Sequence, residues 1–289
     1  MEISRKTLFE NETLQIGLFE ARPLSDACGD VERQDRYAIA LPLSGLFSKH
    51  DSPGRHVIGT PSHAVFFAAD TPYRVGFPGG IGDRALTLRF GAALAPEWLD
   101  TRSTGEAPAS NALLSANVMM LRNLLWTRLE RTEADEFEAE ALGLDLLDLS
   151  LHSVRRGGSP LRPQTRARRT RALERVKEAV ALAPARKWTV AGLAAVANLS
   201  PFHLCHVFRD AVGISIHDYV MHERLAQTLD PVLDGGDLTA IALGAGFNSH
   251  SHFTARFRSF FGCTPGALRR TARATEIAEM RKIVTARRH

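Results

Sequence analysis

Histidine and cysteine are the residues of this 289-residue chain most able to bind a metal or to act as nucleophiles. The three cysteines have neither metal-ligand spacing nor the number that a disulfide framework needs, so we expect reduced thiols at Cys28, Cys205 and Cys263. Four histidines of the C-terminal half fall in two separate predicted helices, without carboxylates at ligand spacing: His203, His206, His250 and His252. The sequence therefore predicts no catalytic residue, no metal site and no cofactor.

A repeat in the C-terminal half indicates a different chemistry. A shift of 49 residues, the distance from position 200 to position 249, pairs Ser200 with Ser249, His203 with His252, Phe208 with Phe257, Arg209 with Arg258, and Gly213 with Gly262. In each copy a short alanine-rich segment precedes a longer one, which begins after a capping serine and ends at a glycine. This pattern predicts two helix-turn-helix units.

Helical spacing divides the second helix of each predicted unit into two faces. The residues expected in the core are Leu204, Val207, Phe208 and Ala211 in the first unit and Phe253, Phe257 and Phe260 in the second. The residues expected on the outer faces are Phe202, Cys205, His206 and Arg209, and then His250, Ser251, Thr254, Ala255 and Arg258. Capped helices with such outer faces suit insertion into the major groove, so we predict this outer set to bind DNA.

The charge of the chain is distributed unevenly. Residues 1–158 contain 16 Lys and Arg against 22 Asp and Glu, a net charge of −6, whereas residues 159–289 contain 20 against 10, a net charge of +10. A chance asymmetry between two solvated surfaces would give the same numbers, but the basic half is also the half with the repeat. We therefore expect residues 159–289 alone to bind a polyanion such as double-stranded DNA.

Composition narrows the class of protein further. Hydrophobic residues make up 44% of the chain and charged residues 24%, which are ordinary values for a globular protein and exclude general disorder. No apolar run approaches the roughly 20 residues that a membrane helix needs, and the first residues have no apolar core typical of a secretion signal. We expect a cytoplasmic protein with no membrane partner.

The first 90 residues are predicted to form short β-strands. Runs rich in apolar, aromatic and β-branched residues, such as LQIGLFEAR, RYAIALPLSG, HAVFFAA, YRVGF and RALTLRF, alternate with turn sequences such as GTPS and PGGIGD. Regular strands at this spacing favour a small sandwich or barrel. Three histidines of this half, His50, His56 and His63, are expected in loop-like stretches, without a His-x-His motif and a following Glu.

Helical periodicity begins at Asn111. Leucines recur at spacings of three and four up to Leu151, with a short break at Arg131–Thr132 that predicts an antiparallel helical hairpin. Its apolar positions fit either core packing or a dimer interface, for which the candidate residues are Leu114, Leu121 and Leu125. A Gly-, Pro- and Arg-rich stretch then predicts a basic linker at 157–171.

The residues of the C-terminal repeat resemble the DNA-binding domain of the AraC/XylS transcriptional regulators. The resemblance spans Thr189–Arg270 and includes the motifs GF-x-S-x-S-x-F at Gly246–Phe253 and G-x-TP at Gly262–Pro265. The β-rich half is architecturally similar to the cupin-like effector-binding and dimerisation domain of that family. The resemblance implies an α+β chain with a cupin-like β-barrel and hairpin at 1–156, the linker, and a double helix-turn-helix domain at 172–289 with its core at 189–270.

What the resemblance implies is a sequence-specific transcriptional regulator that is not an enzyme. Such a regulator, whether activator or repressor, would form a homodimer, contact RNA polymerase, and respond to a small-molecule effector in the β domain. The candidate effector residues are Phe66, Phe67, Tyr73, Arg74 and Phe77. A connecting helix at Ile216–Leu229 would hold the two units, and Pro231 should end or kink it. His206 and Ala255 stand where the family often has arginine, which changes the expected base preference.

Three alternatives remain at this point. The N-terminal domain could serve only dimerisation or partner contact, which leaves a DNA-binding regulator without an effector. A metal-dependent cupin enzyme would need the absent His-x-His motif, and a DNA-repair methyltransferase would need a cysteine cluster where only Cys28 stands. Titration of metabolites against the N-terminal domain separates the first alternative from an effector-controlled regulator.

Overall fold

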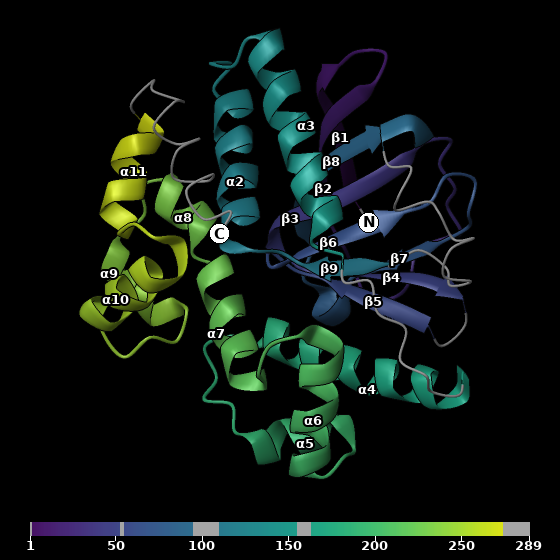
Figure 1. The fold of residues 1–289 in the computed structure, drawn as a ribbon, viewed down its shortest axis with the longest axis vertical. Helices are drawn as coiled ribbons and strands as arrows, with labels where there is room; N and C mark the ends of the chain where they lie inside the picture. The colour runs from purple at the N-terminus through teal and green to yellow at the C-terminus, as the bar shows by residue number, and fades with distance from the viewer. Residues whose placement is uncertain (1, 53–54, 95–109, 155–162, 274–289) are drawn as a thin grey trace.

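The computed structural model describes residues 2–52, 55–94, 110–154 and 163–273, and every structural statement below concerns these residues. Two antiparallel β-sheets form the N-terminal part, and helices cover one side of it and continue to the C-terminus (Figure 1). The predicted α+β class is confirmed, because two β-sheets precede a helical C-terminal part.

The larger sheet has six strands in the order β1-β2-β8-β3-β6-β9, and the smaller has three in the order β5-β4-β7. The strands of the larger sheet are β1 (Glu2–Glu10), β2 (Leu14–Arg22), β8 (Asp83–Phe90), β3 (Tyr37–Gly45), β6 (His63–Phe67) and β9 (Asn111–Leu113). Those of the smaller sheet are β5 (Arg55–Gly59), β4 (Phe47–Ser52) and β7 (Arg74–Gly76). Two short 3-10 helices, η1 (Pro78–Gly80) and η2 (Ala92–Leu94), flank β8.

The three N-terminal histidines expected in loops lie in strands instead. His50 of β4 is paired with His56 of β5, and their ring centroids lie 5.2 Å apart, while His63 begins β6. Strands β4 and β5 pair as antiparallel neighbours, so the stretch expected to be loop-like is mostly strand.

The larger sheet has two different faces because side chains alternate along each strand. Leu86, Leu88 and Phe90 of β8 are buried in the core shared with the helical hairpin. The alternate positions Asp83 and Ala85 point to the other face, toward the smaller sheet. The sheet therefore separates a packed core from a hollow interior.

The hairpin consists of α2 (Ala116–Glu130) and α3 (Glu136–His152), while the first three residues of the segment predicted as helix form β9 instead. Leu114, Leu121 and Leu125 are at most 2% exposed, because they pack on the larger sheet, α3 and the C-terminal helices. The prediction that these three residues form a dimer interface is therefore wrong for this arrangement. They belong to the core of the chain itself.

The basic linker predicted at 157–171 is partly helical. Helix α4 (Pro163–Leu182) begins inside it, and residues 155–162 lie outside the described part. Its C-terminal half supplies a buried face, including Leu173, Val176 and Val180, that packs on the first helix-turn-helix unit. This apolar spacing begins only at Ala172, beyond the arginines, so the linker composition concealed the start of the helix.

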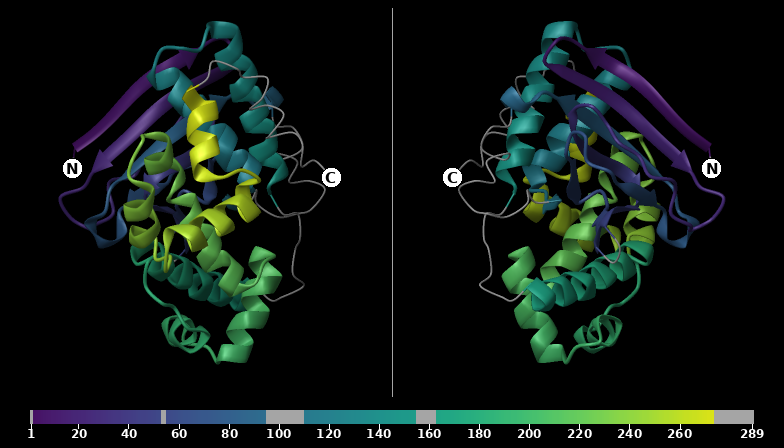
Figure 2. Two further views of the ribbon diagram at one scale, coloured as in Figure 1. Left: turned by 90° about the vertical axis from the view of Figure 1, so that its left-hand side faces the viewer. Right: turned by 90° about the vertical axis from the view of Figure 1, so that its right-hand side faces the viewer.

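The two helix-turn-helix units follow in order. They comprise α5 (Val190–Ala197) and α6 (Pro201–Val212), the connecting helix α7 (Ile216–Ala226), the short α8 (Leu229–Leu233), and then α9 (Leu238–Gly244), α10 (His250–Phe261) and α11 (Pro265–Arg273). Figure 2 shows the second unit beside α2, and α10 and α8 both contact that helix. The first unit packs on α4, which in turn contacts β5.

The connecting helix ends three residues earlier than predicted, at Ala226 instead of Leu229. Pro231 has no N–H for a bond to the carbonyl of Gln227, and its ring would clash with that carbonyl in a continuous helix. The chain therefore starts a new helix, α8, with Pro231 as its third residue, where no intrahelical N–H is needed. The predicted break at this proline is confirmed.

Candidate DNA-binding surface and ligand cavity

Local capping fixes the recognition helix of the first unit. Asn198 takes the left-handed conformation at φ 55° and turns the chain after α5, and the Ser200 hydroxyl then accepts a hydrogen bond from the His203 N–H at 3.2 Å. Leu204, Val207 and Phe208 are buried, whereas Ala211 is exposed and not in the core as predicted. The predicted outer residues are all exposed, and they are Phe202, Cys205, His206 and Arg209.

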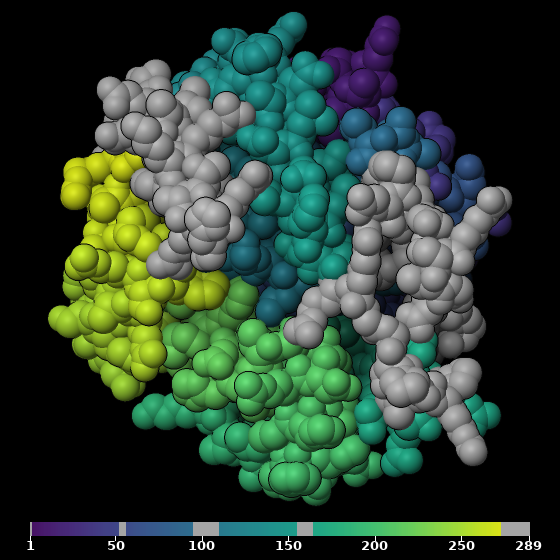
Figure 3. All heavy atoms as spheres, viewed as in Figure 1, coloured from purple at the N-terminus to yellow at the C-terminus, as the bar shows by residue number. Residues whose placement is uncertain are grey.

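The second unit repeats this geometry. The Ser249 hydroxyl accepts from the His252 N–H at 3.1 Å, and Gly262 ends α10 at φ 83°. All five predicted outer residues line one shallow groove on the surface, namely His250, Ser251, Thr254, Ala255 and Arg258. Thr254 is half-buried, and the other four are exposed. Figure 3 shows both units at the surface of the molecule, the first in green and the second in yellow-green.

Aromatic rings form the core beneath the second recognition helix. Phe253, Phe257 and Phe261 are at most 1% exposed, and the ring centroids of Phe257 and Phe261 lie 4.5 Å apart. Phe260, predicted in the core, is half-buried and packs edge-on against Phe261 at 4.8 Å. This cluster holds the orientation of α10, so the groove above it depends on the packing of these rings.

A cavity of about 710 Å³ lies between the two sheets of the N-terminal domain. Its floor is the inner face of the larger sheet, and the smaller sheet contributes Phe47 of β4 and Val75 of β7. A volume in this range suits a small organic ligand. The β domain therefore contains a cavity large enough for a small organic molecule.

The structure corrects the predicted effector residues. Phe67 and Tyr73 line the cavity, whereas Phe66 does not, because adjacent residues of a strand point to opposite faces and Phe66 packs in the core under the helices. Phe77 is 1% exposed in the core between the sheets, outside the lining, and Arg74 is exposed on β7. Lining residues that the sequence prediction missed include Phe19, Phe47, Asp83, Thr87 and Arg89.

Asp83 is the most unusual group of the cavity. Its side chain is buried, and neither carboxylate oxygen has a hydrogen-bond partner among the described residues. Burial raises the pKa of this carboxyl from 3.8 to about 7. The sequence contained a signal for it, since the spacing of two places Asp83 on the same face of β8 as Ala85 and Thr87.

This shift predicts a pH-dependent stability. Between pH 4 and pH 7 the folded chain keeps a proton on Asp83 that the unfolded chain has lost, so stability falls as the pH rises through this window. Asp83→Asn removes this titration. The free energy of unfolding of the variant, relative to the parent, should rise by roughly 3–4 kcal/mol from pH 4 to pH 7. Urea unfolding of both proteins across this range checks it, and a constant difference would contradict the assignment.

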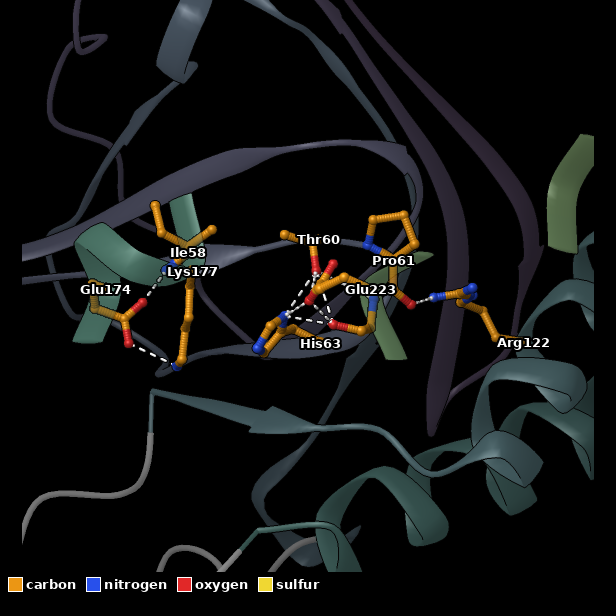
Figure 4. A network of polar contacts seen from close by, with 9 residues as sticks. Ile58, Thr60, Pro61, His63, Arg122, Glu174, Lys177 and Glu223 are labelled. Atoms are coloured by element: carbon orange, nitrogen blue, oxygen red, sulfur yellow. Dashed lines mark hydrogen bonds and ion pairs between the residues drawn. The ribbon is translucent and has the colours of Figure 1, made fainter. Parts of the chain in front are cut away.

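A buried polar network joins the β domain to the C-terminal helices (Figure 4). The Glu223 carboxylate of α7 accepts hydrogen bonds from the hydroxyls of Thr60, at 3.0 Å, and Ser62, and lies 3.6 Å from His63 Nδ1. On the other side of the same turn, the Arg122 guanidinium of α2 donates to the Pro61 carbonyl at 2.6 Å. The turn between β5 and β6 is thus held between α2 and α7.

Burial sets the protonation of this network. Burial, with Lys177 and His222 nearby, lowers the pKa of His63 well below its usual range, and burial raises the pKa of Glu223. His63 is therefore neutral, and its Nδ1 forms hydrogen bonds with the hydroxyls of Thr60, at 2.8 Å, and Ser62, at 3.1 Å. Burial also lowers the pKa of Arg122 to about 9. This value is still above neutral pH, so the guanidinium remains charged.

Two further contacts cross the same boundary. The Glu174 carboxylate of α4 accepts a hydrogen bond from the Ile58 N–H of β5 at 2.8 Å. It also forms an ion pair with Lys177 at 2.8 Å. Arg84 of β8 pairs with Asp230 of α8. The β domain therefore contacts α4, α7 and α8 through buried or half-buried charges, and the helix-turn-helix units are not free to move independently in this conformation.

Within the described part of the chain, no group of three or more His, Cys, Asp and Glu side chains is arranged to hold a metal ion. No single described helix is long and apolar enough to cross a membrane, although α5 and α6, bent by 81°, meet that test as a pair. These two helices are the first helix-turn-helix unit.

Comparisons with known proteins agree with the C-terminal geometry. A helix-turn-helix domain family matches residues 193–271. The HTH-type transcriptional regulator MtrA of Neisseria gonorrhoeae is 33% identical over 94 residues, which cover 30% of this chain and 29% of MtrA. The virulence regulon transcriptional activator VirF of Yersinia enterocolitica is 37% identical over 70 residues, 24% of this chain and 26% of VirF. The matched region thus spans less than a third of either relative.

Solved structures are similar over more of the chain but at lower identity. ToxT of Vibrio cholerae covers 89% of this chain and 98% of its own, at 12% identity and a TM-score of 0.35. A cupin superfamily protein of Desulfitobacterium hafniense covers 31% of this chain and 78% of its own, at 14% identity and a TM-score of 0.27.

The resemblance predicted from the sequence is confirmed for the C-terminal half. Residues 193–271 form a helix-turn-helix domain, which agrees with the resemblance of this region to the AraC/XylS regulators.

Proposed function

We propose that the chain is a DNA-binding transcriptional regulator, controlled by a small molecule in the β domain. The observation that carries the proposal is the duplicated geometry of α6 and α10. Each helix is capped by a serine, packs on buried side chains that include aromatic rings, and presents an exposed face with an arginine as its ninth residue. The half of the chain that contains them has a net charge of +10.

On each exposed helix face, one residue is placed to contact the DNA phosphates and another to contact the bases. Arg209 and Arg258 occupy equivalent exposed positions, from which a guanidinium can contact the DNA backbone without reading sequence. His206 and Thr254 lie nearer the helix tips, where side chains meet base edges. Changes at His206 or Thr254 should therefore alter base preference, whereas the arginines should set general affinity.

The salt dependence of DNA binding tests this proposal. Arg209→Ala and Arg258→Ala should each weaken binding to all sequences alike and reduce the slope of log K against log salt concentration by about one, because each removes a phosphate contact. Fluorescence anisotropy with the full chain measures these slopes. Arg131→Ala, an exposed arginine of the acidic half, is the matched control and should change nothing. A parent protein with a flat salt response would contradict the proposal.

The cavity of the β domain supports control by an effector over the ligand-independent alternative. The cavity has a volume of about 710 Å³ and aromatic rings in its lining. A domain that served only for contact with a partner would not need an internal cavity of this size. Activation through contact with RNA polymerase is the remaining part of the proposal, and it rests on the resemblance of the DNA-binding half to transcriptional activators.

We also propose a homodimer, through a different surface from the leucines now placed in the core. One face of α3 remains open, with Phe137 at 81% exposure and Ala141, Leu144 and Leu151 half-buried. A second copy would cover this apolar face. Phe137→Glu with Leu144→Glu should convert dimer to monomer in sedimentation velocity without unfolding the chain, and a parent that sediments as a monomer at all concentrations would contradict the dimer.

A further inference from the structure

The cavity of the β domain is hollow because its floor is built from small residues. Gly17 of β2, Ala38 and Ala40 of β3, and Ala85 of β8 lie on the inner face of the larger sheet. The larger lining side chains, Phe19, Phe47, Phe67 and Tyr73, surround this floor with aromatic surface. A bound molecule would therefore meet apolar surface on this floor and on the rings around it.

Asp83 is the buried charged residue of the lining, whereas the other charged lining residues are exposed or half-buried, namely Arg5, Lys6, Glu32, Arg33, Asp35 and Arg89. Asp83 lines the cavity and is 6% exposed, and both of its carboxylate oxygens lack hydrogen-bond partners among the described residues. By contrast, the acidic groups near Arg5 and Arg89 already have partners, since Arg5 pairs with Glu32 at 3.2 Å and Arg89 with Asp35 at 2.6 Å. The cavity thus offers one buried acid that is ready to accept hydrogen bonds from a ligand.

A buried carboxyl without a hydrogen-bond partner raises the free energy of the folded state, and a ligand that donates a hydrogen bond to it removes part of this penalty. A protonated amine does so best, because a hydrogen bond between two charged groups is stronger than one between neutral groups. We propose that the cavity binds a small organic amine, with an apolar body against the aromatic rings and its ammonium group on Asp83. This inference rests on the proposed effector control and adds to it the chemical class of the effector.

Two other lining groups do not compete for the same part of the ligand. Arg89 Nε and Gln34 Nε2 are also without partners, but Arg89 lies six residues along β8 from Asp83, about 20 Å in an extended strand. A small ligand bound at Asp83 does not reach that end. A carboxylate ligand at Asp83 would place two acids together, which disfavours it.

Isothermal titration of the full chain with three matched probes tests the inference. The probes are 2-phenylethylamine, 2-phenylethanol and 3-phenylpropanoate, which share a phenyl body and differ in the polar group. We expect the amine to bind at least about tenfold more tightly than the alcohol, and the carboxylate to bind most weakly. Asp83→Asn should weaken amine binding about tenfold or more and leave alcohol binding within about twofold.

The controls separate this inference from the proposed function. Asp35→Asn removes an exposed acid at the other end of the cavity and should leave amine binding unchanged. Asp83→Ser repeats the comparison in case the asparagine variant does not fold. Equal binding of amine and alcohol, preference for the carboxylate, or full amine affinity in both Asp83 variants would overturn the inference. Anisotropy of the same samples with DNA is read separately, so a chain that binds DNA but no amine contradicts only the ligand class.

Discussion

Arg122→Ala should lower the free energy of unfolding by about 3–5 kcal/mol. The Arg122 side chain is fully buried, donates to the Pro61 carbonyl at 2.6 Å, and donates twice to the Asn123 side chain. Alanine leaves these acceptors unpaired in the interior and opens a cavity, two costs that add. Urea unfolding at neutral pH measures the loss.

Arg122→Met is the matched control for packing. Methionine fills most of the same volume but donates no hydrogen bond, so it should cost only about 1–2 kcal/mol. A methionine variant as unstable as the alanine variant would show that the hydrogen bonds dominate. An alanine variant as stable as the parent would contradict the placement of Arg122 in the network.

Phe257→Ala should destabilise the second helix-turn-helix unit by about 3–5 kcal/mol, because it removes a fully buried ring from the centre of an aromatic cluster. Since α10 rests on this cluster, we expect the variant to lose the DNA contacts of the second unit while those of the first unit persist. Hydrogen exchange should show faster opening confined to α9, α10 and α11.

Phe202→Ala provides the contrast. Phe202 is 85% exposed at the tip of α6, so alanine should leave the stability within about 0.5 kcal/mol of the parent and affect only DNA binding. A large loss of stability in this variant, or none in Phe257→Ala, would mean that the inward and outward faces of the recognition helices are assigned incorrectly.

The helix-turn-helix units were predictable because their signals are local. The Ser200 and Ser249 hydroxyls accept hydrogen bonds from backbone N–H groups three residues later, Gly213 and Gly262 end the helices, and most of the apolar positions between follow helical spacing. The predicted outer residues therefore lie on the outer faces as expected. Ala211 was misplaced, since a small residue at the last turn of a helix carries little information about its face.

The cavity was less predictable because its lining depends on which strands pair and which face is covered. Phe66 and Phe67 are adjacent in β6, so the period of two places only one of them in the cavity. The burial of Leu121 and Leu125 depends on C-terminal helices that lie about 100 positions later in the sequence, and no local pattern indicates that contact. Asp83 and Glu223 were missed although both occupy inward positions of their elements, where an acid is rare enough to mark a site.

The buried network gives the ligand cavity a structural connection to the DNA-binding half. The turn at Thr60–His63 contacts α2 through Arg122 and α7 through Glu223, and β8, which contributes Asp83 to the cavity, also carries the Arg84 that pairs with Asp230 of α8. A ligand that shifts β8 would therefore change contacts made by the segment between the two helix-turn-helix units.

Hydroxyl-radical footprinting of the full chain on its preferred DNA sequence tests the central claim most directly. If α6 and α10 both enter the major groove, each subunit should protect two segments about 10 bp apart on one face of the DNA. Phe257→Ala should remove one of the two segments, and Phe202→Ala should weaken the other. A single protected segment per subunit in the parent protein would contradict the claim that both helix-turn-helix units bind DNA.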